Sequence, residues 1–307
     1  MARTRYQSDK GLVGRMFGTM FGLGLLYVIL IAVLLVFIKS TALVIVIAGG
    51  ILFFQWYFSD TMAMRSMRAV EVTPEQAPQL HAVIDRLCAL ADMPKPRVAI
   101  SDMDIPNAFA TGRTPKRAVV CVTTGLLRRL DVQELEGVLS HELSHVAHRD
   151  VTVMTIASFA GVLAGLLARV WMFGGMGGNG RDNRNGNSND SNAALVLFVV
   201  LIVSAVIYAL AFLLTRSLGR YRELSADRTG ALLTGNPSAL ASALQKVSGD
   251  IAAIPDRDLR QAESVNAFAF APAFTQKTSL STLFMTHPPL EKRLEQLAKI
   301  SAQLGQR

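Results

Sequence analysis

Long apolar segments constrain this chain more than any other feature, because they are long enough to cross a membrane. Met16–Ile38, Thr41–Ser59 and Asn192–Thr215 contain no charged residue, and a helix needs about 20 residues to cross the hydrocarbon core. A fourth segment, Val151–Ala168, is shorter and includes hydroxyl side chains, so it is the weakest of the set. The sequence predicts a mainly α-helical integral membrane protein with about four transmembrane helices.

The first apolar segment has a competing interpretation as a cleaved secretory signal. Its apolar run is longer than the apolar core of a secretory signal peptide, which has about 7–15 residues. A second apolar segment also follows almost at once. We therefore expect Met16–Ile38 to be a membrane span that pairs with Thr41–Ser59.

Basic residues beside these segments predict their orientation. Lys and Arg accumulate on the cytoplasmic side of membrane proteins. The basic residues on one side are Arg3, Arg5, Lys10, Arg15, Arg65, Arg68, Arg216, Arg220 and Arg222. Both termini and the segment 60–150 are therefore expected on the cytoplasmic side of the membrane. The net charge of +8 reflects this topology, and no basic stripe with interleaved aromatic residues suggests a nucleic-acid partner.

The apolar segments divide the chain into alternating membrane and soluble parts. The expected parts are an N-terminal two-span hairpin (1–68), a cytoplasmic segment (69–150), a second membrane hairpin (151–215) with a flexible extracytoplasmic loop (174–192), and a C-terminal segment (216–307). Within the soluble parts, Thr73–Gln76 resembles a capped helix start with Pro at its first position. Arg97–Ser101 and Ala118–Thr123 are rich in branched residues and predict short strands, while Pro288–Leu304 predicts an amphipathic helix.

The sequence His141-Glu142-Leu143-Ser144-His145 has the HExxH pattern within a predicted helix. Residues four apart lie on the same helix face, so both imidazoles can bind one Zn²⁺, while the Glu can reach a water on the metal. Asp131 and Glu134 have capping-box spacing, which predicts that the helix begins here. A surface helix that carries two His by chance is the alternative.

A catalytic zinc usually takes a third protein ligand. The candidates are His148, Asp150, Glu223, Asp227 and His287. We favour Glu223, because a membrane hairpin after the HExxH helix would return the chain to the same surface close to this residue. Asp227 stands one turn further on and could accept a hydrogen bond from a ligating His. An exposed charged helix face is the alternative for Glu223 and Asp227.

Four motifs together resemble the HtpX-type membrane zinc metalloproteases, which are relatives of the CAAX prenyl endopeptidases. The motifs are HELSHVAHRD at 141–150, RELSADRTG at 222–230, NAFATG at 107–112 and THPPLEKRL at 286–294. The resemblance implies a zincin-like catalytic domain with a small β element on the cytoplasmic side of the inner membrane, holding one Zn²⁺ per subunit. It also implies a role in heat shock or protein quality control. His148 is a departure, because such proteins often have Asn there.

The resemblance also implies roles for residues outside the zinc helix. Residues Asn107, Ala108, Phe109 and Ala110 resemble an edge strand that binds peptide substrates, with an ordinary loop as the alternative. His287 resembles a late His that approaches the site and donates to the developing oxyanion, although a structural His before Pro288 is also consistent with the sequence.

We expect a zinc metalloendopeptidase in which His141, His145 and Glu223 hold zinc and Glu142 is the general base. Its expected partners are polypeptide substrates, namely misfolded or damaged membrane proteins, and the lipid bilayer. The alternative is a non-catalytic membrane scaffold or transporter with a structural metal site. The Glu of HExxH weighs against that alternative because binding metal does not require it.

Overall fold

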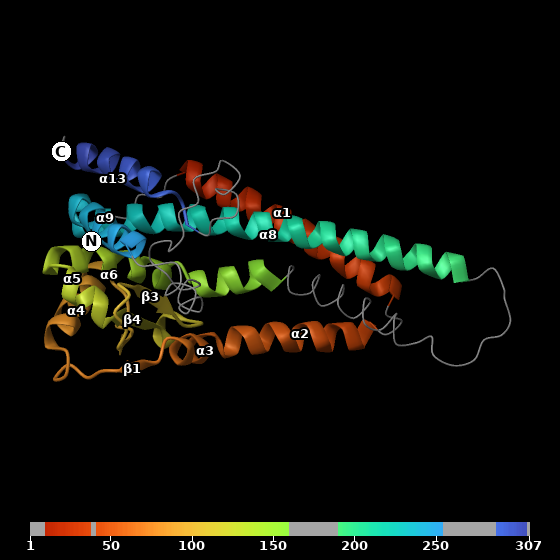
Figure 1. Cartoon of the computed structure of the whole chain (residues 1–307), viewed down its shortest axis with the longest axis horizontal. Coiled ribbons are helices and arrows are strands. Elements are labelled where there is room, and N and C mark those ends of the chain that lie inside the picture. The colour runs from red at the N-terminus through yellow and green to blue at the C-terminus, as the bar shows by residue number, and fades with distance from the viewer. Residues whose placement is uncertain (1–9, 38–40, 160–189, 254–286, 306–307) are drawn as a thin grey trace.

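The computed structural model describes residues 10–37, 41–159, 190–253 and 287–305, and it is mostly helical. Three long helices, α1 (Lys10–Phe37), α2 (Thr41–Tyr57) and α8 (Asp190–Thr234), contain most of the three strongest apolar segments. They run along the long axis, away from a compact group of shorter elements at one end (Figure 1). Residues 174–189 of the predicted loop lie outside the described residues. Residues 190–192, its last three, belong to α8.

Among the described residues, Ile202–Thr234 is the one helix that is long and apolar enough to cross a membrane. Gly14–Ile29 and Asp150–Phe159 are shorter apolar helices. The remainder of the weak fourth segment, 160–168, lies outside the described residues. The fold therefore has the expected membrane character, while the number of spans stays a prediction.

A four-stranded sheet supplies the predicted β element. Its strands, β1 (Ala69–Glu71), β2 (Arg97–Ser101), β3 (Ala108–Thr111) and β4 (Val119–Thr123), lie in the order β1-β2-β4-β3. β2 and β4 are parallel, and the two outer strands are antiparallel to their neighbours. β3 thus forms one edge of the sheet, as the resemblance implied for this segment.

The sheet is covered on both faces, as alternate side chains of β4 show. Val120 and Val122 join the main core, which is formed with α4 (Pro78–Ala91), α6 (Val132–Ala147), α9 (Pro237–Ala253) and α13 (Leu290–Gly305). Val119 and Cys121 instead pack against α3 (Ser59–Ser66). Because side chains alternate between the two faces of a strand, β4 can be buried on both. The short helices η1 (Pro115–Arg117) and α5 (Thr124–Arg129) flank β4.

The predicted helix start at Thr73–Gln76 is wrong by several residues. Gln76 Oε1 accepts a hydrogen bond from Thr73 N at 2.9 Å, as in a capping box, but the chain forms a turn there and α4 begins at Pro78. Pro78 would lie inside the predicted helix, where it has no N–H to donate and disfavours helical geometry in the residue before it. Ala77 accordingly has φ −139° and ψ 63°.

Two close contacts join helices that are far apart in the sequence, one between α8 and α6 and one at the end of α2. Gly230 of α8 lies against α6, where an added Cβ would come within 2.8 Å of Ser140 Oγ and 2.9 Å of His141 N. At the membrane end, Trp56 Nε1 of α2 donates to Thr152 Oγ1 at 3.3 Å. The end of α2 is thereby bound to the helical segment Asp150–Phe159, which follows α6.

Candidate active site

The zinc-motif helix α6 begins where the sequence predicts. Asp131 Oδ1 accepts from Gln133 N and Glu134 N, both at 2.9 Å, and Glu134 Oε2 accepts from Asp131 N at 3.0 Å. This capping box satisfies backbone N–H groups that the first helical turn leaves without partners. The helix then runs to Ala147 and presents His141 and His145 on one face.

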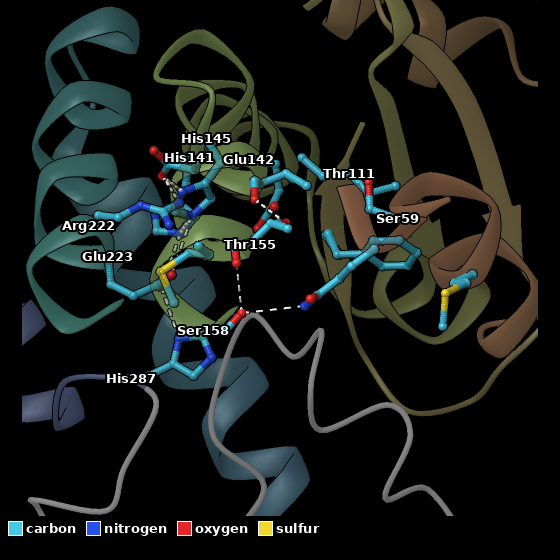
Figure 2. Close-up of a pocket in the computed structure, with 18 residues that line it drawn as sticks. Ser59, Thr111, His141, Glu142, His145, Thr155, Ser158, Arg222, Glu223 and His287 are labelled. Atoms are coloured by element: carbon cyan, nitrogen blue, oxygen red, sulfur yellow. Dashed lines mark hydrogen bonds and ion pairs between the residues drawn. The ribbon is translucent and has the colours of Figure 1, made fainter. Parts of the chain in front are cut away.

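Three donor atoms converge where α6 meets α8. His141 Nε2 and His145 Nε2 are 3.2 Å apart, and Glu223 Oε2 and Oε1 lie 3.5 Å and 3.4 Å from them respectively. Figure 2 shows the two imidazoles on α6 facing Glu223 on α8. Zinc bonds of about 2.0–2.1 Å at tetrahedral angles separate neighbouring donors by about 3.3–3.4 Å. Two imidazoles and a carboxylate at this spacing fit a zinc ion.

Each histidine has a separate carboxylate behind it. Asp227 Oδ1 lies 2.9 Å from His141 Nδ1, and Asp150 Oδ2 lies 2.5 Å from His145 Nδ1. A carboxylate on Nδ1 fixes the tautomer that leaves the Nε2 lone pair toward a metal. The arrangement therefore orients both Nε2 atoms toward the same point.

Each of these carboxylates is in turn paired with a buried arginine. Arg293 of α13 donates to both oxygens of Asp227, with Nε–Oδ2 and Nη2–Oδ1 distances of 2.7 Å and 2.6 Å. Arg222 of α8 forms an ion pair with Asp150. Burial disfavours the charged form of Arg293, but the adjacent Asp227 carboxylate outweighs it and raises the Arg293 pKa.

Glu142 lies beside the donor group and is almost completely buried. Burial is the largest influence on its carboxyl group and raises its pKa above the usual value, although the neighbouring imidazoles act in the opposite direction. The backbone N–H of Ala110 in β3 donates a hydrogen bond to this carboxyl group. Glu142 is therefore held between the donor group and the edge strand, with a raised proton affinity.

A cavity of 630 Å³ lies in front of these groups. Its walls come from α6, α8, β3, the end of α2 with α3, and the segment Asp150–Phe159. In Figure 2, Ser59 and Thr111 lie across the cavity from Glu223 and His287. An elongated molecule fits between the three donor residues and the edge of β3.

Of the other residues that the sequence predicts for the site, some line the cavity and some do not. His287 lines the cavity, with its Nδ1 3.0 Å from Glu223 Oε2. Ala108, Phe109 and Ala110 line it as well. Asn107 is buried, and its backbone N–H and carbonyl are bonded to Thr123. His148 caps the end of α6, exposed and away from the three donors.

The sequence does not predict the residues that hold the two histidines in place. The sequence predicts Asp150 only as a candidate ligand, whereas the structure places it behind His145. For Arg222 it predicts only a charge beside a membrane span, and for Arg293 only a place in an amphipathic helix. One signal was available for Arg222, namely that it immediately precedes Glu223. Nothing local identifies Arg293 as the partner of Asp227, because α13 meets α8 only in the folded chain.

The chain is similar to proteins of known families over most of its length. Residues 74–301 match the model of peptidase family M48. The chain is 56% identical over 308 residues to "Protease HtpX homolog 1" of Streptomyces coelicolor, covering 99% of this chain and 97% of that protein. It is 49% identical over 305 residues to "Protease HtpX homolog" of Moorella thermoacetica, covering 99% of both.

Among solved structures, the crystal structure of S. mikatae Ste24p has a TM-score of 0.45 at 15% identity, covering 94% of this chain and 66% of that one. That similarity is too low to establish a shared fold. The family match and the two relatives do not depend on it. The chain belongs to peptidase family M48, and within it resembles the HtpX proteases.

Proposed function

We propose that this protein is a membrane-embedded zinc endopeptidase that cleaves misfolded or damaged membrane proteins at the cytoplasmic surface. The observation that carries the proposal is the position of Glu142 beside three donor atoms at zinc spacing. Zinc held there by His141, His145 and Glu223 would supply an electrophile that acidifies water and polarises a peptide carbonyl. A scaffold with a structural metal would have no use for Glu142.

Glu142 is the general base in this proposal. Its raised pKa favours proton uptake, and the Ala110 amide fixes the carboxyl group without neutralising it. It takes a proton from the attacking water and passes it to the leaving amine, so that one group serves both half-reactions.

We assign β3 and His287 to the substrate. Ala108 and Ala110 are two residues apart, so their backbone groups point to the same edge of the strand. That edge faces the cavity, and Glu142 already accepts from the Ala110 N–H. We assign the remaining backbone groups of Ala108 and Ala110 on this edge to an extended peptide bound through main-chain hydrogen bonds, which suits loose sequence preference. His287 Nδ1 is next to Glu223, and its other ring nitrogen is the donor that we assign to the carbonyl oxygen as it becomes anionic.

The membrane placement follows from the two helices that carry the ligands. The chain leaves α6, passes through 151–215 and returns in α8 to the same end of the molecule (Figure 1). Two crossings bring it back to one membrane face, and the flanking basic residues favour the cytoplasmic face. We therefore propose four spans, cytoplasmic termini and a cytoplasmic site in a bacterial inner membrane.

A Glu142→Gln variant tests the proposed reaction. It removes the base and leaves the ligands intact, so zinc content should equal that of the wild type while casein cleavage falls by roughly 10²–10⁴-fold. Glu136→Gln is the matched control, because it removes a carboxylate from the same helix whose ion-pair partner among the described residues is the exposed Arg86. Full cleavage by purified Glu142→Gln would refute the assignment.

A further inference from the structure

An ion pair closes the base of the second membrane hairpin directly beside the zinc ligand His145. Asp150 begins the helical segment Asp150–Phe159 that enters this hairpin, and Arg222 lies in α8, which leaves it. One Asp150 oxygen, Oδ2, contacts both His145 Nδ1 and Arg222 Nη2. Asp150 and Arg222 are only 4% and 6% exposed.

A break in the helix is what lets Asp150 reach His145. Residues three or four apart are neighbours on a helix, whereas residues five apart point in different directions. The break lies at Arg149, which has φ +55°. This left-handed conformation is unfavourable for a residue with a Cβ. It ends α6 and starts the next helix at a new angle, with the Asp150 carboxylate beside the imidazole.

Few polar contacts among the described residues offset the cost of burying the Arg222 charge. Its Nε and Nη1 are buried and make no hydrogen bond among the described residues, and its recorded ion pair is with Asp150. A buried pair of this kind contributes little net stability, since desolvation offsets the attraction. Removing one partner is costly, however, because it leaves the other charge buried alone. We therefore expect this pair to hold the side chains in one geometry rather than to stabilise the fold.

We propose that Asp150 and Arg222 form a joint through which the second membrane hairpin positions His145 for zinc. Asp150 fixes the ring with Nε2 toward the metal, and Arg222 fixes Asp150. Both are positioning residues, and the inference rests on the proposed zinc site. The other histidine has a different carboxylate behind it, because Asp227, which is paired with Arg293 of α13, contacts His141. Of the two histidines, His145 is the one whose orienting carboxylate begins the helical segment that enters the hairpin.

Zinc affinity of the full-length protein in detergent, measured by competition with a chromophoric chelator, tests the joint. Asp150→Asn keeps the size of the side chain but removes its charge, and should weaken zinc binding by roughly 10–100-fold. Arg222→Met should also weaken it. The double variant should bind like Asp150→Asn alone, because Arg222 acts only through Asp150. Arg220→Met, which removes a cation from the same helix, is the control and should bind like the wild type.

Melting temperatures of the zinc-free proteins separate positioning from general stability. A purely structural pair would lower these temperatures and leave zinc affinity unchanged, which would overturn the proposal. Losses in the two single variants that multiply in the double variant would overturn it too. If Asp150→Asn does not fold, Asp150→Glu retains the charge but moves the carboxylate, and unchanged zinc affinity would again contradict the joint. A wild type that binds no zinc would refute the metal site itself.

Discussion

At the residue scale, the site separates the groups that can bind a metal from the groups that orient them. Glu223 and the two Nε2 atoms face one another, while Asp227 and Asp150 contact the Nδ1 atoms. Burial disfavours a charged His141, but Asp227 and Glu223 outweigh it and raise the pKa of the imidazole. A divalent ion between the Nε2 atoms would supply the positive charge that these carboxylates favour.

Replacing the third ligand should affect metal binding far more than replacing the nearest alternative. Glu223→Ala leaves only two donors and should lose zinc on mild chelation, whereas His148→Ala should retain wild-type zinc because His148 is outside the donor group. Zinc per chain after dialysis against a weak chelator is the measurement. Loss of zinc from His148→Ala with retention by Glu223→Ala would show that the third ligand is wrong.

The residues that could be predicted from sequence are those fixed by local geometry. His141, Glu142 and His145 follow from helix periodicity, whereas the choice of Glu223 depends on a longer-range argument, the expected return of a membrane hairpin to the same surface. Asp150 reaches its place through a left-handed residue at 149, which the sequence does not reveal because Arg is not favoured there. Arg293 depends on a contact between distant helices, and such contacts have no signature in local spacing.

At the scale of secondary-structure elements, the site depends on how closely α8 approaches α6. Gly230 allows this approach, and it lies two turns beyond Glu223 on the same helix. Local signals predicted the start of α6 well, because the capping box involves residues three apart. They failed for α4, where Pro78 overrode the Thr73–Gln76 signal and moved the helix start.

A side chain at Gly230 should push α8 away from α6. The Cβ in Gly230→Ala would meet Ser140 Oγ and the backbone of His141 below normal contact distance, and overpacking of this kind costs about 1–3 kcal/mol. Both the melting temperature and zinc affinity should fall, since Glu223 moves with the helix.

The matched control is Gly249→Ala in α9, where an added Cβ meets nothing within 4 Å. That change should raise stability by up to about 1 kcal/mol through helix propensity and leave zinc affinity unchanged. If Gly230→Ala matched this control in both measurements, the close approach of the helices would not be what sets the site.

At the scale of the whole molecule, the proposed topology makes the membrane hairpin part of the active site. The ligand helices are neighbours at one end of the structure, while α8 extends far from it (Figure 1). A single crossing between His145 and Glu223 would separate them by a hydrocarbon core about 30 Å thick. We therefore expect 151–168 either to cross fully or to dip into the membrane and return, together with the apolar part of α8.

Labelling with an impermeant maleimide tests this topology. A cysteine introduced at Asn185 should react in intact spheroplasts, and one at Gln306 only after lysis. Background reaction should be low, because burial raises the pKa of Cys88 to about 11 and that of Cys121 to about 12 and leaves little thiolate. Labelling of Asn185 only after lysis would mean that the hairpin does not cross.

The most direct test of the account is whether peptide cleavage by the purified full-length protein follows its zinc content. We predict one zinc per chain, loss of casein cleavage when a chelator removes it, and recovery when one equivalent is restored, because the three donor residues would hold a single ion. Cleavage that persists in zinc-free protein, or zinc-loaded protein that cleaves nothing, would contradict the proposed endopeptidase.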